Sequence, residues 1–296
     1  DAARFFILFG ASPSSGLEWS EEGVDFAYRY IKNTFILVSE FPENIRDELN
    51  IRDTLIQYYL NKTIKDFTEN MKNIAIRNAV NNIIQFTSEF GKYKSEGVNK
   101  AIYDECVENM ILLLHPIAPH MTEEIWERLG KKGYASLAMW PSYNEELLNK
   151  ESDYKWKLMN NTLEDINNIK TVMKKENLDN ISIIIADHWK LKFYNTLMIL
   201  LEKTINQGEI MKKLMEENDL KKYSSQIGKI VNRVLRNIGK YPKFTISTDE
   251  EYQFFTEIKL IIERKYNCKV EIIHEKDSKE QKASQALPGK PAIVII

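Results

Sequence analysis

Apolar residues recur at helical spacing through the first half of the chain. Between positions 20 and 42 they stand three or four residues apart, behind Ser20 as a possible N-cap and two glutamates that suit a first helical turn. The spacing returns three times before position 115, with Asn- or Gly-containing breaks between the repeats. The four sets are Val24, Ala27, Tyr28, Ile31, Phe35 and Val38; Ile51, Leu55, Tyr58 and Tyr59; Ala75, Ala79, Ile83, Phe86 and Phe90; and Ile102, Cys106, Met110 and Leu113. Because the connections are short and each stripe is too wide to stay in water, the pattern predicts an antiparallel helix bundle over residues 1–150.

The second half mixes helical and alternating patterns. Helices are expected at residues 153–175, from Trp189 to Leu220, and after a capping box formed by Thr248 and Glu251. Strands are expected at Ile181–Ile185, Phe244–Ile246 and Cys268–Ile272, where β-branched or apolar residues alternate. Residues 151–275 are therefore predicted to form a small α/β domain.

The last segment, residues 276–296, reads as a polar linker followed by a short apolar tail. Two interpretations of the tail stay open: a free segment whose deletion leaves both cores intact, or an edge strand that completes the sheet. The predicted fold class is thus mainly α, with an antiparallel helix bundle followed by a small α/β C-terminal domain and a short apolar tail.

Composition indicates a soluble globular protein. The 296 residues are 43% hydrophobic and 28% charged, and no apolar run approaches the roughly 18 residues of a membrane span. Cys106 and Cys268 lie inside apolar periodic segments, which suggests core thiols in a reducing compartment. The start, Asp1 to Arg4, lacks a Met and the layout of a signal peptide, so we expect an excised fragment.

Charge is unevenly distributed. Residues 1–150 hold 16 Lys and Arg against 22 Asp and Glu, whereas residues 151–296 hold 25 against 21. The excess is local, because residues 221–243 contain seven basic residues and no acid. A local basic excess favours an anionic partner such as nucleic acid, although a merely solvated helix face would look the same.

The basic segment itself predicts a two-faced helix. After Ser224 and Ser225 as possible caps, four cations fall on one helical face while apolar residues occupy another. These cations are Lys229, Arg233, Arg236 and Lys240. A row of cations of this kind can follow RNA phosphates, and arginine adds bidentate contacts.

Signs of catalytic chemistry are missing from the sequence. It contains no His-Glu-x-x-His pair, no Cys-x-x-Cys, and no glycine-rich phosphate loop. His115 and His120 flank two prolines, and we expect each to bond a backbone group at a helix end rather than a metal. We therefore expect no catalytic residue, no metal site and no cofactor in this chain.

One stretch resembles a known family. His115-Pro-Ile-Ala-Pro-His-Met-Thr-Glu-Glu-Ile-Trp-Glu-Arg-Leu129 resembles the late helix of the anticodon-binding bundle in class I aminoacyl-tRNA synthetases of the leucine, isoleucine, valine and methionine group. Residues 1–9 and 17–29 resemble the segment that follows the Lys-Met-Ser-Lys-Ser loop of these enzymes, a loop that is absent here. The motif residues for which we expect structural roles are Arg4, Trp19, His115, Pro116, Pro119, Glu123 and Trp126.

The tail narrows the resemblance. Residues Ala286–Ile296 are similar to the C-terminus of archaeal-type leucyl-tRNA synthetases, in which an extra C-terminal domain reaches the long variable arm of leucine tRNA. The resemblance implies a tRNA-binding, non-catalytic portion of such an enzyme, inactive alone. Its partners would be leucine tRNA and the catalytic domain of the same polypeptide, in a cytoplasmic monomer whose parent uses ATP.

Two groups of residues are the candidate tRNA contacts. They are Lys221, Lys222, Lys229, Arg233, Arg236, Lys240 and Lys243 in the basic segment, and Leu287, Pro288, Lys290, Pro291, Ile295 and Ile296 in the tail. Backbone contacts by the cations would position RNA, and the tail would read exposed bases. A helical scaffold that binds protein partners, with a merely solvated basic helix, is the alternative.

Overall fold

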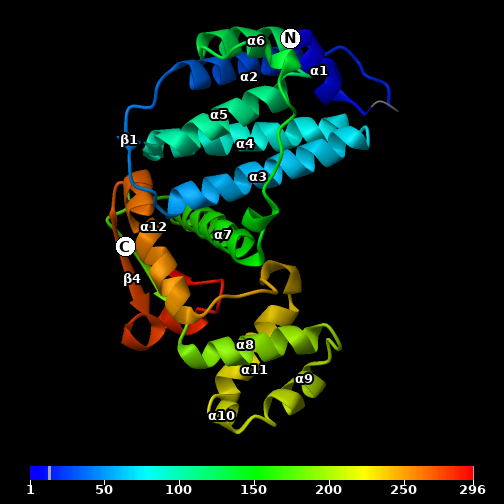
Figure 1. Ribbon diagram of the computed structural model, residues 1–296. Coiled ribbons are helices and arrows are strands. Elements are labelled where there is room, and N and C mark those ends of the chain that lie inside the picture. Colours follow the sequence, from blue (N-terminus) through cyan, green and yellow to red (C-terminus); the bar gives the residue numbers. More distant parts are fainter. Residues whose placement is uncertain (13–14, 296) are drawn as a thin grey trace. The chain divides into compact units, whose positions relative to one another are not determined.

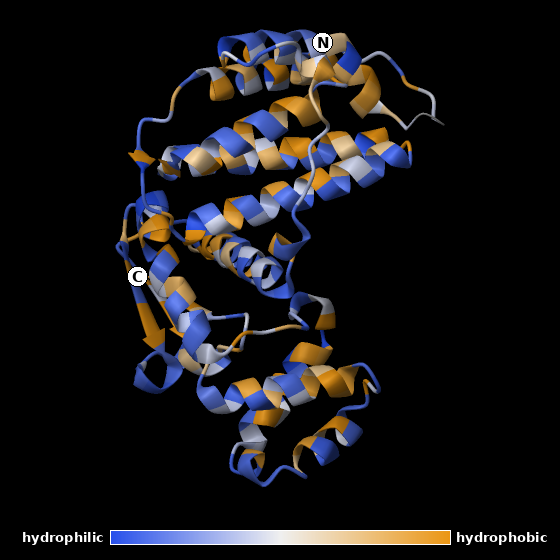
Figure 2. Cartoon of the chain, in the orientation of Figure 1, coloured by the Kyte–Doolittle hydropathy of each residue, from blue (hydrophilic) through white to orange (hydrophobic). Residues whose placement is uncertain are grey.

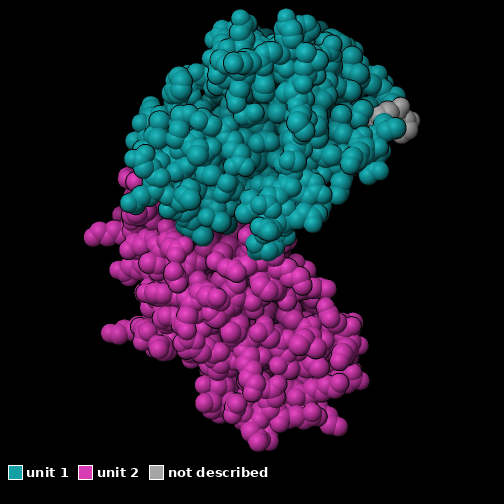
Figure 3. All heavy atoms as spheres, in the orientation of Figure 1, with its two compact units in different colours: residues 1–149 teal, residues 150–296 magenta. Residues whose placement is uncertain are grey.

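The computed structural model describes residues 1–12 and 15–295, and these form two compact units (Figures 1 and 3). Unit 1 is Asp1–Asn149 and unit 2 is Lys150–Ile296. The described residues contain twelve α-helices and two small sheets, of two and three strands, so the mainly α fold class is confirmed. Among them, no helix combines the length and apolar character needed to cross a membrane.

Unit 1 is a bundle of six helices. They are α1 (Ala2–Gly10), α2 (Glu21–Ser39), α3 (Ile51–Lys72), α4 (Ile76–Glu96), α5 (Lys100–Leu114) and α6 (Pro119–Arg128). Helix α3 packs against α4 and α5, and α1 against α2 and α4. Hydrophobic residues recur along the helices of unit 1 (Figure 2), and the apolar stripes predicted from spacing form its core. Phe67 of α3, Phe86 of α4 and Met110 of α5 have no exposed surface.

The ends of these helices follow local signals only in part. Ser20 caps α2 by accepting a hydrogen bond from the backbone N–H of Gly23 at 3.2 Å, as its position predicts. Helix α6 begins at Pro119, in the first turn, where proline loses no helical hydrogen bond. Helix α1 has no counterpart among the periodic segments identified in the sequence.

A buried carboxylate ties one end of the bundle together. The two-residue strands β1 (Ile45–Arg46) and β2 (Val98–Asn99) pair in parallel beside Asp53, which is fully buried. Arg46 donates to both carboxylate oxygens, at 3.0 and 2.9 Å, and the backbone N–H of Asn50 donates at 2.7 Å. Burial raises the pKa of Asp53, but the hydrogen bonds from Arg46, Tyr93 and Asn50 outweigh burial and hold this pKa below its ordinary value.

Unit 2 combines a small sheet with helices. Its helices are α7 (Lys150–Met173), α8 (His188–Leu201), α9 (Gln207–Leu214), α10 (Asn218–Lys221), α11 (Ser224–Leu235) and α12 (Thr248–Tyr266), and its strands are β3 (Asn180–Ile185), β4 (Lys269–His274) and β5 (Ala292–Ile295). The strand order is β4-β3-β5, with β4 parallel and β5 antiparallel to β3. Ile183 stands opposite both Ile272 and Ile293, so the sheet is apolar at its centre.

Several local expectations in unit 2 are wrong. Residues 244–246 form no strand. The capping box of α12 uses Ser247 and Glu250, one residue before the expected pair, and this shift turns Glu251 inward. Helix α11 has no side-chain cap and ends at Leu235, so its cationic row stops there; Lys240 lies in a separate 3-10 turn, Ile238–Lys240.

The C-terminal segment is part of unit 2 and not a free tail. Strand β5 pairs with β3 over its length, so the structure contains the edge strand that the sequence left open. Four of the apolar residues expected to meet RNA are buried: Leu287, Pro288, Pro291 and Ile295. Ile296 lies outside the described residues.

A tight turn leads into β5. The backbone N–H of Leu287 donates to the carbonyl of Lys290 at 3.0 Å, and that of Lys290 donates to the carbonyl of Leu287 at 2.8 Å. Between them stand Pro288 and Gly289, whose φ of 72° is the left-handed conformation required at the third position of a type II turn. The buried carboxyl of Glu251 accepts a hydrogen bond from the Gly289 N–H at 3.0 Å.

We predict that ionisation of Glu251 makes unfolding easier as the pH rises. Burial raises the pKa of this carboxyl from 4.5 to about 7. Below pH 4.5 both the folded and the unfolded chain hold the proton; between the two values only the unfolded chain releases it, so stability falls until the pH passes the folded pKa. The loss is on the order of 3 kcal/mol. Urea unfolding from pH 4 to 8 should show this dependence in the wild type and not in Glu251→Gln; parallel pH profiles for the two would contradict it.

We also predict that truncation after Gln285 destabilises unit 2. The deletion removes β5 and the buried side chains of Leu287, Ile293 and Ile295. At about 1.5–3 kcal/mol for each buried side chain, the free energy of unfolding should fall by at least about 4 kcal/mol. Thermal and urea melts measure the change, and Lys279→Gln, at an exposed site in the same segment, should have no effect. An unchanged melting temperature after truncation would show that β5 is dispensable.

Candidate nucleic-acid interface

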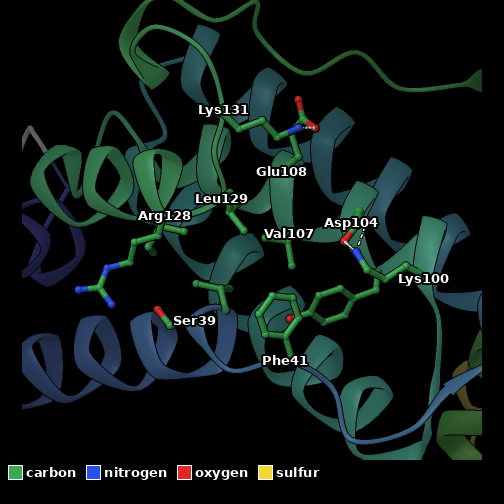
Figure 4. Close-up of a pocket in the computed structure, with 12 residues that line it drawn as sticks. Ser39, Phe41, Lys100, Asp104, Val107, Glu108, Arg128, Leu129 and Lys131 are labelled. Carbon is green, nitrogen blue, oxygen red and sulfur yellow. Dashed lines mark hydrogen bonds and ion pairs between the residues drawn. The ribbon is translucent and has the colours of Figure 1, made fainter.

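Unit 1 contains a hollow of about 590 Å³ between the end of α2 and helices α5 and α6 (Figure 4). Its wall is apolar, with Val107 and Leu129, and the ring of Phe41 is 80% exposed at its edge. The cations on its rim are neutralised, because Lys100 pairs with Asp104 and Lys131 with Glu108. A rim whose cations are paired with carboxylates has no free positive charge to bind a phosphate.

The predicted basic residues of unit 2 do not form one row. Lys221 bonds Asn218 at 2.8 Å, and Lys222 lies 4.9 Å from the ring centre of Tyr223. Lys229 is exposed on α11, and Arg236 is exposed just after its end. The helix therefore presents Lys229 and Arg233 only, and the remaining cations of the segment lie on other elements.

Arg233 lies in a hollow of about 400 Å³ that also contains Lys290 and Pro291, so the structure unites part of the basic segment with part of the tail. Its guanidinium Nη2 donates to the backbone carbonyl of Gln285 at 2.9 Å, while Nε is buried without a hydrogen-bond partner in the described chain. Lys282 adds a third, exposed cation. We call this depression the Arg233 hollow.

A second depression, of about 470 Å³, adjoins it and shares the side chain of Tyr241. Lys240 and Lys243 of the basic segment line this Lys240 hollow, together with Phe244, which is 41% exposed. The side-chain Nζ of Lys243 is 3.7 Å from a carboxylate oxygen of Glu202, whereas the side chain of Lys240 has no hydrogen bond or ion pair with any described residue. We call the two hollows together the Tyr241 surface.

The chemistry of the Tyr241 surface suits an unpaired nucleotide. Cations surround an aromatic ring, and the Nζ of Lys290 lies 5.6 Å from the ring centre of Tyr241. Asp165 and Asn168 of α7 also line the Arg233 hollow, which gives it hydrogen-bond acceptors for a base amino group. Cations that meet phosphates, rings that stack on bases and a few polar groups that meet base edges are the usual elements of single-stranded RNA recognition.

Among the motif residues of unit 1, Glu123, Trp126 and Pro119 have helix-end or packing contacts. The carboxylate of Glu123 accepts from the backbone N–H groups of Ala135 at 2.8 Å and Ser136 at 3.0 Å, and these bonds outweigh burial and lower its pKa. Trp126 is buried, whereas Trp19 is 66% exposed. Arg4 and Pro116 are exposed, and Pro119 starts α6.

The two histidines differ from expectation because their partners are side chains. Nδ1 of His115 is 2.8 Å from the hydroxyl of Thr122, and Nδ1 of His120 is 3.0 Å from a carboxylate oxygen of Asp1. In the described residues no group of three or more His, Cys, Asp or Glu side chains is arranged to hold a metal ion.

Sequence reasoning missed several residues of the Tyr241 surface, among them Tyr241, Asp165 and Lys282. Tyr241 itself follows Lys240 inside the basic segment, and an aromatic residue among cations was a usable signal. Asp165 and Lys282 had no recognisable signal in the sequence, because only tertiary packing brings α7 and the segment before β5 to the same hollow.

Comparison with known proteins identifies a domain and a group of relatives. Residues 53–185, from α3 through β3, match the anticodon-binding domain of tRNA ligase. The leucine–tRNA ligase of Pyrococcus furiosus is 28% identical over 305 positions, which cover 100% of this chain and 31% of that protein. Those of Archaeoglobus fulgidus and Methanosarcina barkeri are 28% and 27% identical, again over 100% of this chain and over 30% and 32% of their own lengths.

The chain thus spans about a third of the length of these curated relatives. A solved LeuRS–tRNA–LeuAMS ternary complex from Agrobacterium radiobacter is similar over 63% of this chain and 21% of that chain, at 19% identity and a TM-score of 0.43. The family resemblance of the sequence is confirmed: residues 53–185 match the anticodon-binding domain of tRNA ligase, and the whole chain is similar in sequence to the C-terminal third of leucine–tRNA ligases of archaea.

Proposed function

We propose that the chain is the tRNA-binding, non-catalytic portion of a leucyl-tRNA synthetase. The observation that supports this most directly is the similarity of its whole length to leucine–tRNA ligases, together with the match of residues 53–185 to an anticodon-binding domain. Its partners are leucine tRNA and the catalytic domain of the same polypeptide, in a cytoplasmic monomer. The parent enzyme attaches leucine to tRNA and binds ATP, whereas the chain alone neither activates leucine nor charges tRNA.

Within unit 2, the Tyr241 surface is the proposed contact with the long variable arm. Its cations, Arg233, Lys240, Lys282 and Lys290, supply phosphate contacts, and Tyr241 supplies a stacking face. The tip of a tRNA arm exposes unpaired bases, which a hollow with both rings and polar groups can accept. Of the tail residues first expected to read RNA, Lys290 and Pro291 line the hollow, whereas Leu287, Pro288 and Ile295 are buried inside unit 2.

We predict that the chain binds leucine tRNA more tightly than a tRNA with a short variable arm. Filter binding of the two RNAs at equal salt measures the preference, and leucine tRNA with its variable arm shortened is the matched control. Equal affinity for all three RNAs would show that the chain contacts a part of the tRNA other than the long variable arm. Failure to bind any of them would favour the scaffold alternative, in which the neutral hollow of unit 1 meets a protein.

We predict that the triple variant Arg233→Gln, Lys240→Gln and Lys290→Gln reduces the salt dependence of tRNA binding. Each lost phosphate contact should remove roughly 0.7–0.9 from the slope of log affinity against log salt. A second triple variant, Lys221→Gln, Lys229→Gln and Arg236→Gln, separately tests the exposed cations on α11 and close to its two ends. Lys259→Gln is the control, because Lys259 already faces Glu263 at 3.8 Å. An unchanged slope in the first triple variant, with the fold intact by circular dichroism, would refute the role of the Tyr241 surface.

A further inference from the structure

The geometry of the Tyr241 surface depends on the Leu287–Lys290 turn. Lys290, at the end of the turn, lines the Arg233 hollow, and Gly289, at its corner, lines the Lys240 hollow. A shift of this turn by a few tenths of an ångström would therefore change both hollows. The group that holds the turn in place decides how well the surface is organised in advance for RNA.

Glu251 contacts this turn from inside the unit. It lies in the first turn of α12 and has no exposed surface. Its Oε2 accepts from the Gly289 N–H at 3.0 Å and from the hydroxyl of Tyr154 on α7 at 3.2 Å. Its Oε1 is buried and has no hydrogen-bond partner in the part of the chain that the structure describes. One carboxyl group thus joins α12, α7 and the turn.

The turn is closely packed on this side. A Cβ at Gly289 would lie 2.5 Å from Cγ of Pro242 and 2.9 Å from the Tyr154 hydroxyl. Pro242 directly follows Tyr241, and its carbonyl accepts from the hydroxyl of Tyr194 at 2.8 Å. The turn and the segment that bears Tyr241 are therefore packed directly against each other, with Glu251 behind them.

Stability alone does not account for a carboxyl group at this position. The titratable groups that face it are the phenols of Tyr154 on α7 and Tyr194 on α8, and no cation is among its partners. A buried carboxyl without a cation costs free energy, and an apolar side chain of similar size would avoid that cost. What the carboxyl adds is a hydrogen bond that an apolar side chain cannot make, to the backbone N–H of Gly289.

We propose that Glu251 is a positioning residue for RNA binding, which fixes the Leu287–Lys290 turn so that Lys290 stays beside Tyr241. The proposal rests on the proposed function of the Tyr241 surface. Glu251 itself meets no RNA, since it has no exposed surface. Its effect on RNA should therefore pass through Lys290.

The test uses the full chain, leucine tRNA and two substitutions of similar size. Glu251→Met fills the space but offers no acceptor to Gly289, whereas Glu251→Gln retains a carbonyl oxygen. The Met variant should weaken tRNA binding several-fold and lower the salt slope by roughly 0.7–0.9, the loss expected for one phosphate contact. The Gln variant should keep the tRNA affinity and the salt slope of the wild type. Thermal melts of each variant establish that it is folded.

A double variant separates positioning from general loosening. If Glu251 acts through Lys290, then Glu251→Met combined with Lys290→Gln should bind tRNA no more weakly than Lys290→Gln alone. A folded Met variant with wild-type affinity and slope overturns the proposal, as does a double variant whose losses add. If the Met variant fails to fold, Glu251→Asp, which withdraws the carboxyl by one methylene, is measured in the same cycle with the same outcomes.

The result also distinguishes this proposal from the proposed function. A wild-type chain that does not bind leucine tRNA overturns the proposed function and this inference with it. The inference alone is overturned if the wild-type chain binds leucine tRNA, Lys290→Gln lowers the salt slope of binding, and Glu251→Met leaves that slope unchanged.

Discussion

A buried ammonium group determines where the C-terminal segment lies. Lys190 of α8 has no exposed surface, and its Nζ donates at 2.8 Å to Glu275 and to the backbone carbonyls of Ser284 and Ala286. Burial lowers the pKa of Lys190, and the bond to Glu275 opposes this effect. Because an unpaired buried ammonium costs several kcal/mol, residues 284–286 have to remain at this place. The turn, β5 and the Arg233 hollow follow directly along the chain.

The distribution of ion pairs explains how a chain of net charge −2 can carry a locally cationic surface. In unit 1 the cations around the hollow are neutralised by acids of the same or a neighbouring helix. On the Tyr241 surface, Lys240 and Lys282 have no acidic partner among the described residues, and Arg233 bonds a backbone carbonyl. Net charge therefore says less about an RNA partner than does the local balance between cations and their neighbours.

The stretch that resembles the synthetases is a structural signature. Glu123 bonds the backbone at residues 135–136, His115 bonds Thr122, and Trp126 packs in the core of unit 1. These contacts join α6 to α5 and to the segment that follows it. A motif of caps and packing identifies the bundle well, because its geometry requires those residue types, but it does not mark where RNA binds.

The sequence by itself determined helices α2 to α5 of the bundle, the strands β3 and β4, and the cationic character of residues 221–243, since each depends on residues close together in the chain. It misplaced the cap of α12 and extended α11 past Leu235, because neighbouring serines and threonines offer equivalent caps and helical spacing does not show where a helix ends. Only tertiary structure decided that Arg233, Tyr241 and Lys290 share one hollow and that the tail is an edge strand. Those outcomes rest on hydrogen bonds between residues far apart in the sequence, such as Lys190 with Ala286 and Glu251 with Gly289. No local sequence pattern encodes contacts of this kind.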